Sequence, residues 1–216
     1  MALQEDFERT GDRFFRWRSY LPLAMAVLFM AALLSSPGSA AATQTGVAWG
    51  WLCLAVSFIG LGIRFFTVGY APRGTSGRNT RWQVAETLNT TGLYSAVRNP
   101  LYLGNFIIWL GLALFIQIWW VILIVILSFT LFYERIILAE ECFLREKFGV
   151  TFLDWAEKTP VIIPRFKHWQ PSELPFSWKA ALTREYSSFF ATISSFTILA
   201  IIKQSLQSGT LFQETS

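Results

Sequence analysis

The chain has 216 residues, of which 53% are hydrophobic and 15% are charged, and its mean hydropathy is +0.42. Soluble domains usually carry about 25% charged residues, so this composition excludes an ordinary soluble protein and indicates an integral membrane protein. The net charge of +4 does not indicate a nucleic-acid partner, because the basic residues flank apolar stretches and no nucleic-acid-binding module is recognisable.

Five apolar stretches approach the roughly 20 residues that a helix needs to cross a bilayer. They are residues 20–34, 47–68, 101–116, 118–133 and 187–202. Gln117 alone separates the third from the fourth, which predicts a tight helical hairpin. Serines dilute the last stretch, so a helix lying in the membrane interface is the alternative there. We expect an all-α integral membrane protein with about five transmembrane helices.

Arginine is concentrated in residues 9–18, in the connection at 69–98 and after residue 133, whereas residues 35–46 carry no charge. Positive residues favour the cytoplasmic side of a membrane. The pattern therefore places the amino terminus, the central loop and the segment after the hairpin in the cytoplasm. Residues 1–41 could also be a signal peptide, but the acidic residues near their start favour a retained anchor.

The third expected span begins with the segment Arg-Asn-Pro-Leu-Tyr-Leu-Gly at residues 98–104. Pro100 disfavours a helical conformation at Asn99 but is tolerated in the first turn of a helix. The free N–H groups and partial positive charge of a helix start suit an anionic group. The alternative interpretation is an interfacial anchor at an ordinary helix start.

A pair of carboxylates, Glu140 and Glu141, follows the expected hairpin. Glu141 can pair with Arg145 four residues later, while the other carboxylate can face inward. Such a pair alone is usually a solvated helix face. Glu134 lies nearer the apolar hairpin and is a second candidate for a functional carboxylate, because its burial would be more costly. The two cysteines and one histidine have no metal-ligand spacing, so no metal site is expected.

These motifs occur in a recognisable order, followed by Phe148-Gly149, Phe152, Trp155 and the segment 160–164. Together they resemble the isoprenylcysteine carboxyl methyltransferase and phospholipid methyltransferase superfamily. The resemblance implies S-adenosylmethionine (SAM) as cofactor, a cytoplasmic cofactor pocket, and a single domain 1–216 with a cofactor-binding core at 93–165 and a tail at 166–216. The cofactor residues that it implies are Arg98, Asn99, Tyr102, Gly104, Glu140 and Glu141, with Arg98 and Glu141 also expected to be catalytic.

Asn99 stands where this family has histidine, and it can donate and accept hydrogen bonds but cannot carry a charge. No histidine general base is therefore implied. An anionic carboxylate or phosphate oxygen can attack a sulfonium methyl group without losing a proton, whereas an amine must first be deprotonated. We expect an O-methyltransferase acting on a membrane lipid. The candidate anion clamp, with topology determinants as the alternative role, consists of Arg64, Arg73, Arg78 and Arg81.

Residues 75–80, 88–95, 178–182 and 184–186 are similar to bacterial lipid A 1-phosphate methyltransferase-like proteins. This similarity implies a lipid A phosphate as acceptor, and a bacterial inner membrane with the active site facing the cytoplasm. The alternatives within the class are an isoprenylcysteine carboxylate, a phospholipid amine or a small thiol. Outside it, the chain could be an NADPH-dependent membrane reductase or a small non-enzymatic membrane scaffold.

Overall fold

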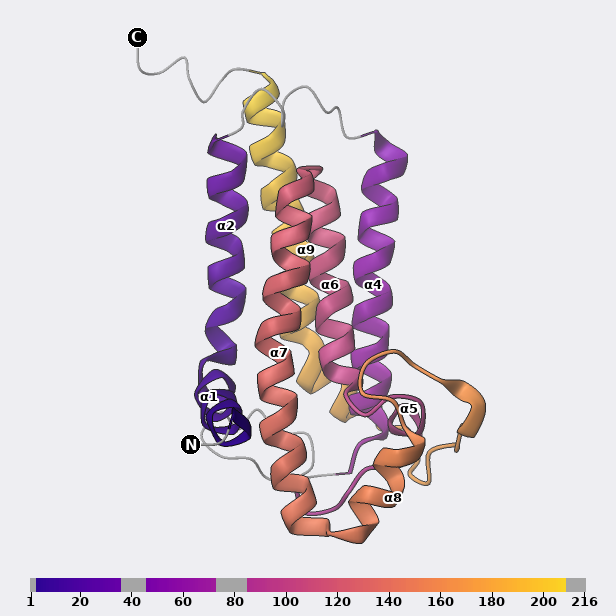
Figure 1. The fold of residues 1–216 in the computed structure, drawn as a ribbon. Coiled ribbons are helices and arrows are strands. Elements are labelled where there is room, and N and C mark those ends of the chain that lie inside the picture. The colour runs from indigo at the N-terminus through magenta and orange to yellow at the C-terminus, as the bar shows by residue number, and fades with distance from the viewer. Residues whose placement is uncertain (1–2, 36–45, 73–84, 209–216) are drawn as a thin grey trace.

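The computed structural model describes residues 3–35, 46–72 and 85–208. Within these ranges the chain forms helices and no strands, which confirms the all-α prediction (Figure 1). The elements are α1 (Leu3–Trp17), η1 (Arg18–Tyr20), α2 (Leu21–Ser35), α4 (Val47–Tyr70), α5 (Leu93–Ala96), α6 (Pro100–Ile116), α7 (Trp119–Phe148), α8 (Val150–Lys158), η2 (Phe166–His168) and α9 (Trp178–Gln207).

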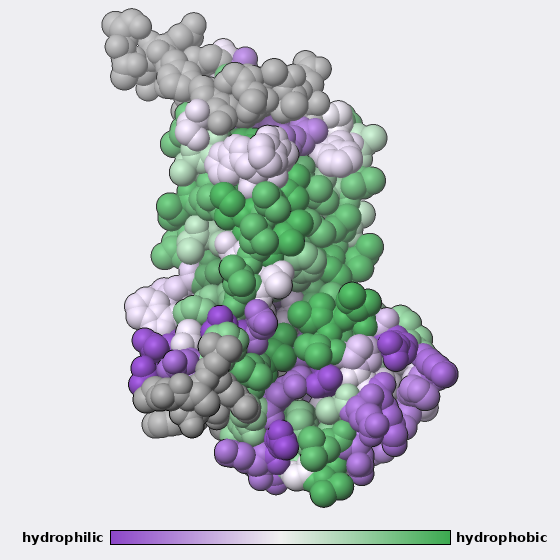
Figure 2. Space-filling model, viewed as in Figure 1, coloured by the Kyte–Doolittle hydropathy of each residue, from purple (hydrophilic) through white to green (hydrophobic). Residues whose placement is uncertain are grey.

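Four helical stretches in the described residues are long and apolar enough to cross a membrane. They are Arg9–Ser35, Val47–Tyr70, Trp119–Phe148 and Trp178–Gln207, and Pro100–Ile116 is a shorter apolar helix. These helices indicate an integral membrane protein. Figure 2 shows a broad hydrophobic band across the middle of the molecule and hydrophilic side chains at the end that carries α1, α5 and α8.

The last helix is longer than the sequence indicated, because its hydroxyl side chains do not interrupt it. The Thr192 hydroxyl donates to the Ser188 carbonyl at 2.8 Å, and that of Thr197 donates to the Ile193 carbonyl at 3.0 Å. Polar side chains in an apolar helix can satisfy themselves in this way on the preceding turn. The segment 187–202 is therefore part of a helix long enough to span a membrane.

The predicted tight hairpin is confirmed. Helix α6 ends at Ile116, Gln117 adopts a left-handed conformation with φ 62°, and α7 begins at Trp119. The Gln117 N–H donates to the Leu114 carbonyl at 3.2 Å, which caps the end of α6. The turn carries the chain directly from one apolar helix into the next.

Helices α4 and α6 approach each other closely through small residues. A Cβ atom on Gly60 would lie 2.5 Å from the Gly104 carbonyl oxygen, and a Cβ atom on Gly104 would lie 2.6 Å from Cγ of Arg64. The Ser57 hydroxyl also donates to the Ile108 carbonyl at 2.9 Å. Small residues permit such backbone contact between membrane helices. The contact places Arg64 against the first turns of α6.

Helix α1 lies across α7 at the hydrophilic end of the molecule (Figure 1). The Phe14 and Phe132 rings are stacked with centroids 4.7 Å apart, and the Arg135 guanidinium lies 3.4 Å from the centroid of the Phe7 ring. Gly11 is buried against the backbone of Arg135, where a larger side chain would collide. This packing holds the start of η1 beside the first turn of α6.

Candidate active site

The start of α6 has the geometry that its sequence predicts. Asn99 is not helical, with φ −123° and ψ 61°, and Pro100 occupies the first helical turn. The Asn99 side-chain amide donates to the Val161 carbonyl at 3.2 Å. Asn99, which replaces the family's histidine, therefore holds the segment after α8. This contact needs only the hydrogen-bonding capacity of Asn99 and no charge.

Arg98 joins three segments of the chain at this point. Its backbone N–H donates to the Pro160 carbonyl at 2.8 Å and its Nε donates to the Thr159 carbonyl at 2.7 Å. Its Nη1 donates to Oε1 of Glu141 at 2.8 Å, and the two side chains are 18% and 25% exposed. Charge-assisted hydrogen bonds of this kind are about twice as strong as neutral ones. Arg98 and Glu141, which the sequence predicts to act together, are in contact.

The expected pairing of Glu141 with Arg145 is not the arrangement in the structure. The Arg145 side chain is exposed, and Glu141 faces the start of α6 instead. A carboxylate on a helix can form an ion pair with a basic residue four positions later, but an exposed pair of this kind contributes only about 0.3–0.5 kcal/mol to stability. The partly buried Arg98 offers a charge partner with less competition from water.

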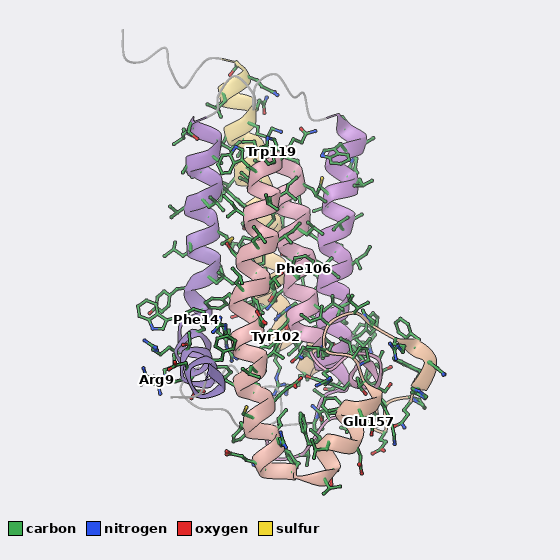
Figure 3. The ribbon with its side chains drawn as sticks, in the orientation of Figure 1. Arg9, Phe14, Tyr102, Phe106, Trp119 and Glu157 are labelled. Carbon is green, nitrogen blue, oxygen red and sulfur yellow. The ribbon has the colours of Figure 1, made fainter. Side chains whose placement is uncertain are left out.

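The second carboxylate makes a different set of contacts. The Tyr102 hydroxyl donates to Oε1 of Glu140 at 2.6 Å, and Nη1 of Arg18 lies 3.5 Å from that hydroxyl and 3.8 Å from the same carboxylate oxygen. Figure 3 shows Tyr102 where α6 faces α7, with Phe14 of α1 nearby. The neighbouring glutamates pair with different arginines, Arg18 for Glu140 and Arg98 for Glu141, which offsets part of their mutual repulsion.

Sequence reasoning missed Arg18, because its arginine-rich surroundings indicated only membrane orientation. The residues that come together here, called the convergence below, are Arg18, Arg98, Asn99, Tyr102, Glu140 and Glu141. The remaining predicted residues lie outside it. Gly104 lies at the contact of α4 with α6, where its missing side chain admits Arg64. Glu134 is exposed, so the carboxylates that converge are Glu140 and Glu141.

The predicted anion clamp is separated in the structure. Arg73, Arg78 and Arg81 lie outside the described residues. Arg64 is described, and its Nε and Nη2 atoms donate to the two carboxylate oxygens of Glu185, each at 2.8 Å. The sequence placed this arginine at the membrane surface to meet an acceptor; the structure pairs it with a carboxylate of the same chain. Its binding of an acceptor stays a prediction.

A pocket of about 280 Å³ lies between the end of α4, the segment 87–94 and residues 173–174. Its lining includes the aromatic Phe66 and Tyr70 and the polar Asn89, Thr90 and Tyr94. Burial, together with the negative charge of the nearby Glu140, raises the pKa of Tyr94 to about 12, against a lowering effect of its hydrogen bond with Asn89. Tyr94 thus forms a wall of the pocket within electrostatic reach of Glu140.

Residue types that bind metals do not gather elsewhere in the described parts of the chain. Among residues 3–35, 46–72 and 85–208, no three His, Cys, Asp or Glu side chains form a group that could hold a metal ion. The convergence consists of two arginines, two glutamates, a tyrosine and an asparagine at one end of a helical bundle.

Residues 47–151 match the model of the phospholipid methyltransferase family. The chain carries a segment of the phospholipid methyltransferase family. The superfamily resemblance drawn from the motifs is confirmed where the two ranges overlap, at residues 93–151. The matched range itself runs from the first residue of α4 into α8. The phospholipid methyltransferase segment contains Arg98, Tyr102, Glu140 and Glu141 but neither Arg18 nor Glu185. The match supports a membrane methyltransferase.

Two metal-resistance proteins are similar to part of the chain. It is 35% identical over 118 residues to the nickel-cobalt-cadmium resistance protein NccN of Alcaligenes xylosoxydans xylosoxydans, covering 53% of each chain. It is 36% identical over 107 residues to the cobalt-zinc-cadmium resistance protein CzcN of Cupriavidus metallidurans, covering 49% of this chain and 47% of the relative. The chain thus spans about half the length of these curated relatives. No solved structure matches the chain.

Proposed function

We propose that this protein is an integral-membrane, SAM-dependent O-methyltransferase whose cofactor is held at the Arg98–Glu141 and Tyr102–Glu140 pairs. The observation that carries the proposal is the contact of Arg98 with Glu141, made inside the segment that matches the methyltransferase family. Both side chains remain partly exposed, so a ligand can reach them.

The side chains fit the charges of this cofactor. SAM has a cationic sulfonium and an ammonium group, which carboxylates bind, and a carboxylate, which a guanidinium binds. Glu140 and Glu141 supply the negative groups, and Arg98 and Arg18 supply the positive ones. When bound, SAM supplies an electrophilic methyl group. The fixed polar groups of this chain would hold the reacting centre in line with an acceptor without large rearrangement.

The acceptor that this arrangement favours is an anionic oxygen on a membrane lipid, with the phosphate of lipid A as the leading candidate. His168 is the only histidine of the chain and is exposed in η2. An anionic oxygen needs no general base, whereas an ammonium group would need one. Arg73, Arg78 and Arg81 remain the proposed phosphate contacts. The lipid would enter from the bacterial inner membrane, with the cofactor arriving from the cytoplasm.

The first test is calorimetric binding of SAM and of NADPH to the protein in detergent, with and without added lipid. We expect saturable SAM binding that falls at least about tenfold in Arg98→Ala and Glu141→Gln, because each leaves a partly buried charge without its partner. Glu134→Gln is the matched control, since it removes an exposed carboxylate from the same helix. Well-folded protein that binds NADPH but not SAM would replace the methyltransferase proposal with a reductase.

The acceptor is tested separately with methyl-labelled SAM. Membranes containing the protein are given lipid A, phosphatidylethanolamine or a prenylated cysteine, and the label is followed into lipid. We expect transfer to the phosphate of lipid A. Transfer to the prenylcysteine carboxylate would keep the O-methyltransferase and change its acceptor, whereas transfer to the amine would replace it with an N-methyltransferase.

The names of the two relatives favour a second candidate, a membrane scaffold or transport accessory that contributes to metal resistance. This role predicts that metal tolerance of a host expressing the chain survives Arg98→Ala and Glu141→Gln. If both variants fold and insert but tolerance is lost, while Glu134→Gln keeps it, the scaffold role is excluded.

A further inference from the structure

The most buried carboxylate of the described residues that enters an ion pair lies outside the matched family segment. Glu185 of α9 is 2% exposed, and its two oxygens accept hydrogen bonds from Nε and Nη2 of Arg64 in α4, each at 2.8 Å. This paired geometry fixes the plane of the guanidinium as well as its position. Nη2 of Arg64 also lies 3.5 Å from the Ser188 hydroxyl.

The other edge of the Arg64 guanidinium points into the bundle. Its Nη1 donates to Oδ1 of Asn105 at 2.6 Å. Because the Asn105 oxygen faces this cation, its amide nitrogen faces the opposite way and donates to the Tyr133 hydroxyl at 3.4 Å. The charge on Arg64 thus sets which end of the Asn105 amide meets Tyr133.

Tyr133 in turn contacts the residue that binds Glu140. The Tyr133 and Tyr102 rings have centroids 4.6 Å apart, and on its other side Tyr133 stacks on Phe129 at 4.2 Å. Tyr133 is 5% exposed and has little room to turn. Its partner Tyr102 donates its hydroxyl to Glu140 at 2.6 Å. A continuous series of contacts therefore runs from the tail helix to the candidate active site.

A buried ion pair contributes little net stability to a fold, because the cost of desolvating two charges offsets much of their attraction. Its distinctive property is directional: a guanidinium held on one edge can present its other edge in one orientation only. We infer that Glu185 is a positioning residue, which acts through Arg64, Asn105 and Tyr133 to fix Tyr102 against Glu140. Its effect on a cofactor rests on the proposed function; its effect on Tyr102 does not.

Arg64 thus has a different role from the acceptor contact that its sequence position indicated. The arginine acts inside the bundle, on the orientation of another side chain, and the acceptor contact is left to arginines elsewhere. This role also gives α9 a task beyond anchoring the tail. The residues that match the family supply the convergent groups, and residues on either side of that segment, Arg18 and Glu185, hold them.

The test removes both charges at once, because removing one would leave the other buried without a partner. In Arg64→Met/Glu185→Met, side chains of similar length replace the pair, so the bundle is expected to unfold near the wild-type temperature. Asn105 loses its fixed partner, and SAM affinity is expected to fall roughly tenfold, the smaller end of losses seen when outer-shell partners are removed. Lys203→Met, which removes a buried charge from the far end of α9, is the matched control and should keep its affinity.

A second measurement does not depend on SAM. Fluorotyrosine placed at position 102 reports the surroundings of that ring by fluorine NMR in detergent. We expect its resonance to shift or broaden in the double variant and to stay unchanged in Lys203→Met. A shift without any SAM binding by the wild type would support the positioning role and reject the proposed cofactor. An unchanged resonance in a folded double variant would overturn the inference.

Discussion

Helix α9 buries one charge near each end, and the two charges have different partners. Glu185 meets the oppositely charged Arg64. Lys203, 4% exposed, donates to the Phe115 carbonyl at 3.3 Å and to the Gln117 side-chain oxygen at 3.1 Å, both at the end of α6. A cation suits the partial negative charge of a helix end. The two buried charges thus have different roles. Lys203 binds the turn that ends α6, whereas Glu185 orients Arg64, which contacts Tyr102 through Asn105 and Tyr133.

The largest expected effect on stability comes from breaking the Arg64–Glu185 pair. Arg64→Met alone would leave the Glu185 carboxylate buried without its cation, so we expect a loss of about 3–5 kcal/mol in unfolding free energy. The loss can be measured by denaturant titration in mixed micelles. A variant that lost no more stability than Lys203→Met would show that the two ends of α9 are equivalent.

A smaller loss is expected where α4 approaches α6 beside the Arg64 contact. In Gly60→Ala, the new Cβ would lie 2.5 Å from a carbonyl oxygen of α6, so the helices must separate. We expect a loss of about 1–3 kcal/mol, typical of overpacking, and weaker SAM binding as Arg64 moves from Asn105.

Gly62→Ala is the control for this change, because it lies on the same helix and its Cβ would meet no atom within 4 Å. It should leave stability unchanged or raise it by up to about 1 kcal/mol, the helix-propensity difference between the two residues. Equal effects of the two alanines on thermal unfolding would contradict the close approach at Gly60.

The end of α9 that carries Lys203, whose partners are neutral, should tolerate change better. Lys203→Met removes two hydrogen bonds but also removes the cost of burying an ammonium group. We expect a net loss of about 1 kcal/mol or less, with unchanged SAM affinity. Thermal unfolding and calorimetry on the same preparation check both parts. A large loss of affinity would mean that the hairpin turn communicates with the candidate active site.

The smallest effect at neutral pH concerns Tyr94. Its pKa of about 12 lies above the ordinary tyrosine value of about 10, so the folded protein keeps this phenol neutral while an unfolded chain would ionise it. The stability that the neutral phenol contributes is therefore present below pH 10 and is lost as the pH rises from about 10 to 12. The difference between the ultraviolet titrations of the wild type and of Tyr94→Phe should show one phenol that ionises near pH 12, and this late step is assigned to Tyr94.

Glu140→Gln sharpens this measurement. The Glu140 charge disfavours ionisation of Tyr94, so its removal should bring the late step to lower pH. An unmoved step would mean that the pocket wall and the carboxylate are electrostatically separate. Glu134→Gln, on the exposed side of the same helix, should leave the step where it is.

The sequence predicted the parts of this structure that depend on local pattern. Apolar length located α2, α4, α6, α7 and α9, and Gln117 between two apolar runs located the hairpin turn. The ordered motifs brought Arg98 and Glu141 together, because the family resemblance carries a spatial relation that periodicity does not. Local reasoning chose Arg145 as the partner of Glu141, since it considers only neighbours on one helix.

Two residues of the candidate site could not be found in this way. Arg18 lies 84 positions before Tyr102, and Glu185 lies 121 positions after Arg64. Neither belongs to a motif, and in the sequence each resembles an ordinary charge near a membrane helix. Their roles depend on which helix faces which, a property decided by contacts such as that of Gly60 with Gly104.

The separation of Arg64 from Glu185 also has a consequence for synthesis. At about 5–20 residues per second, a ribosome needs roughly 6–24 s to add the 121 positions between them. During that interval α4 carries an arginine whose carboxylate has not been made. The Arg64 side chain can reach the lipid headgroups until the last helix is made, so insertion of α9 would complete the assembly.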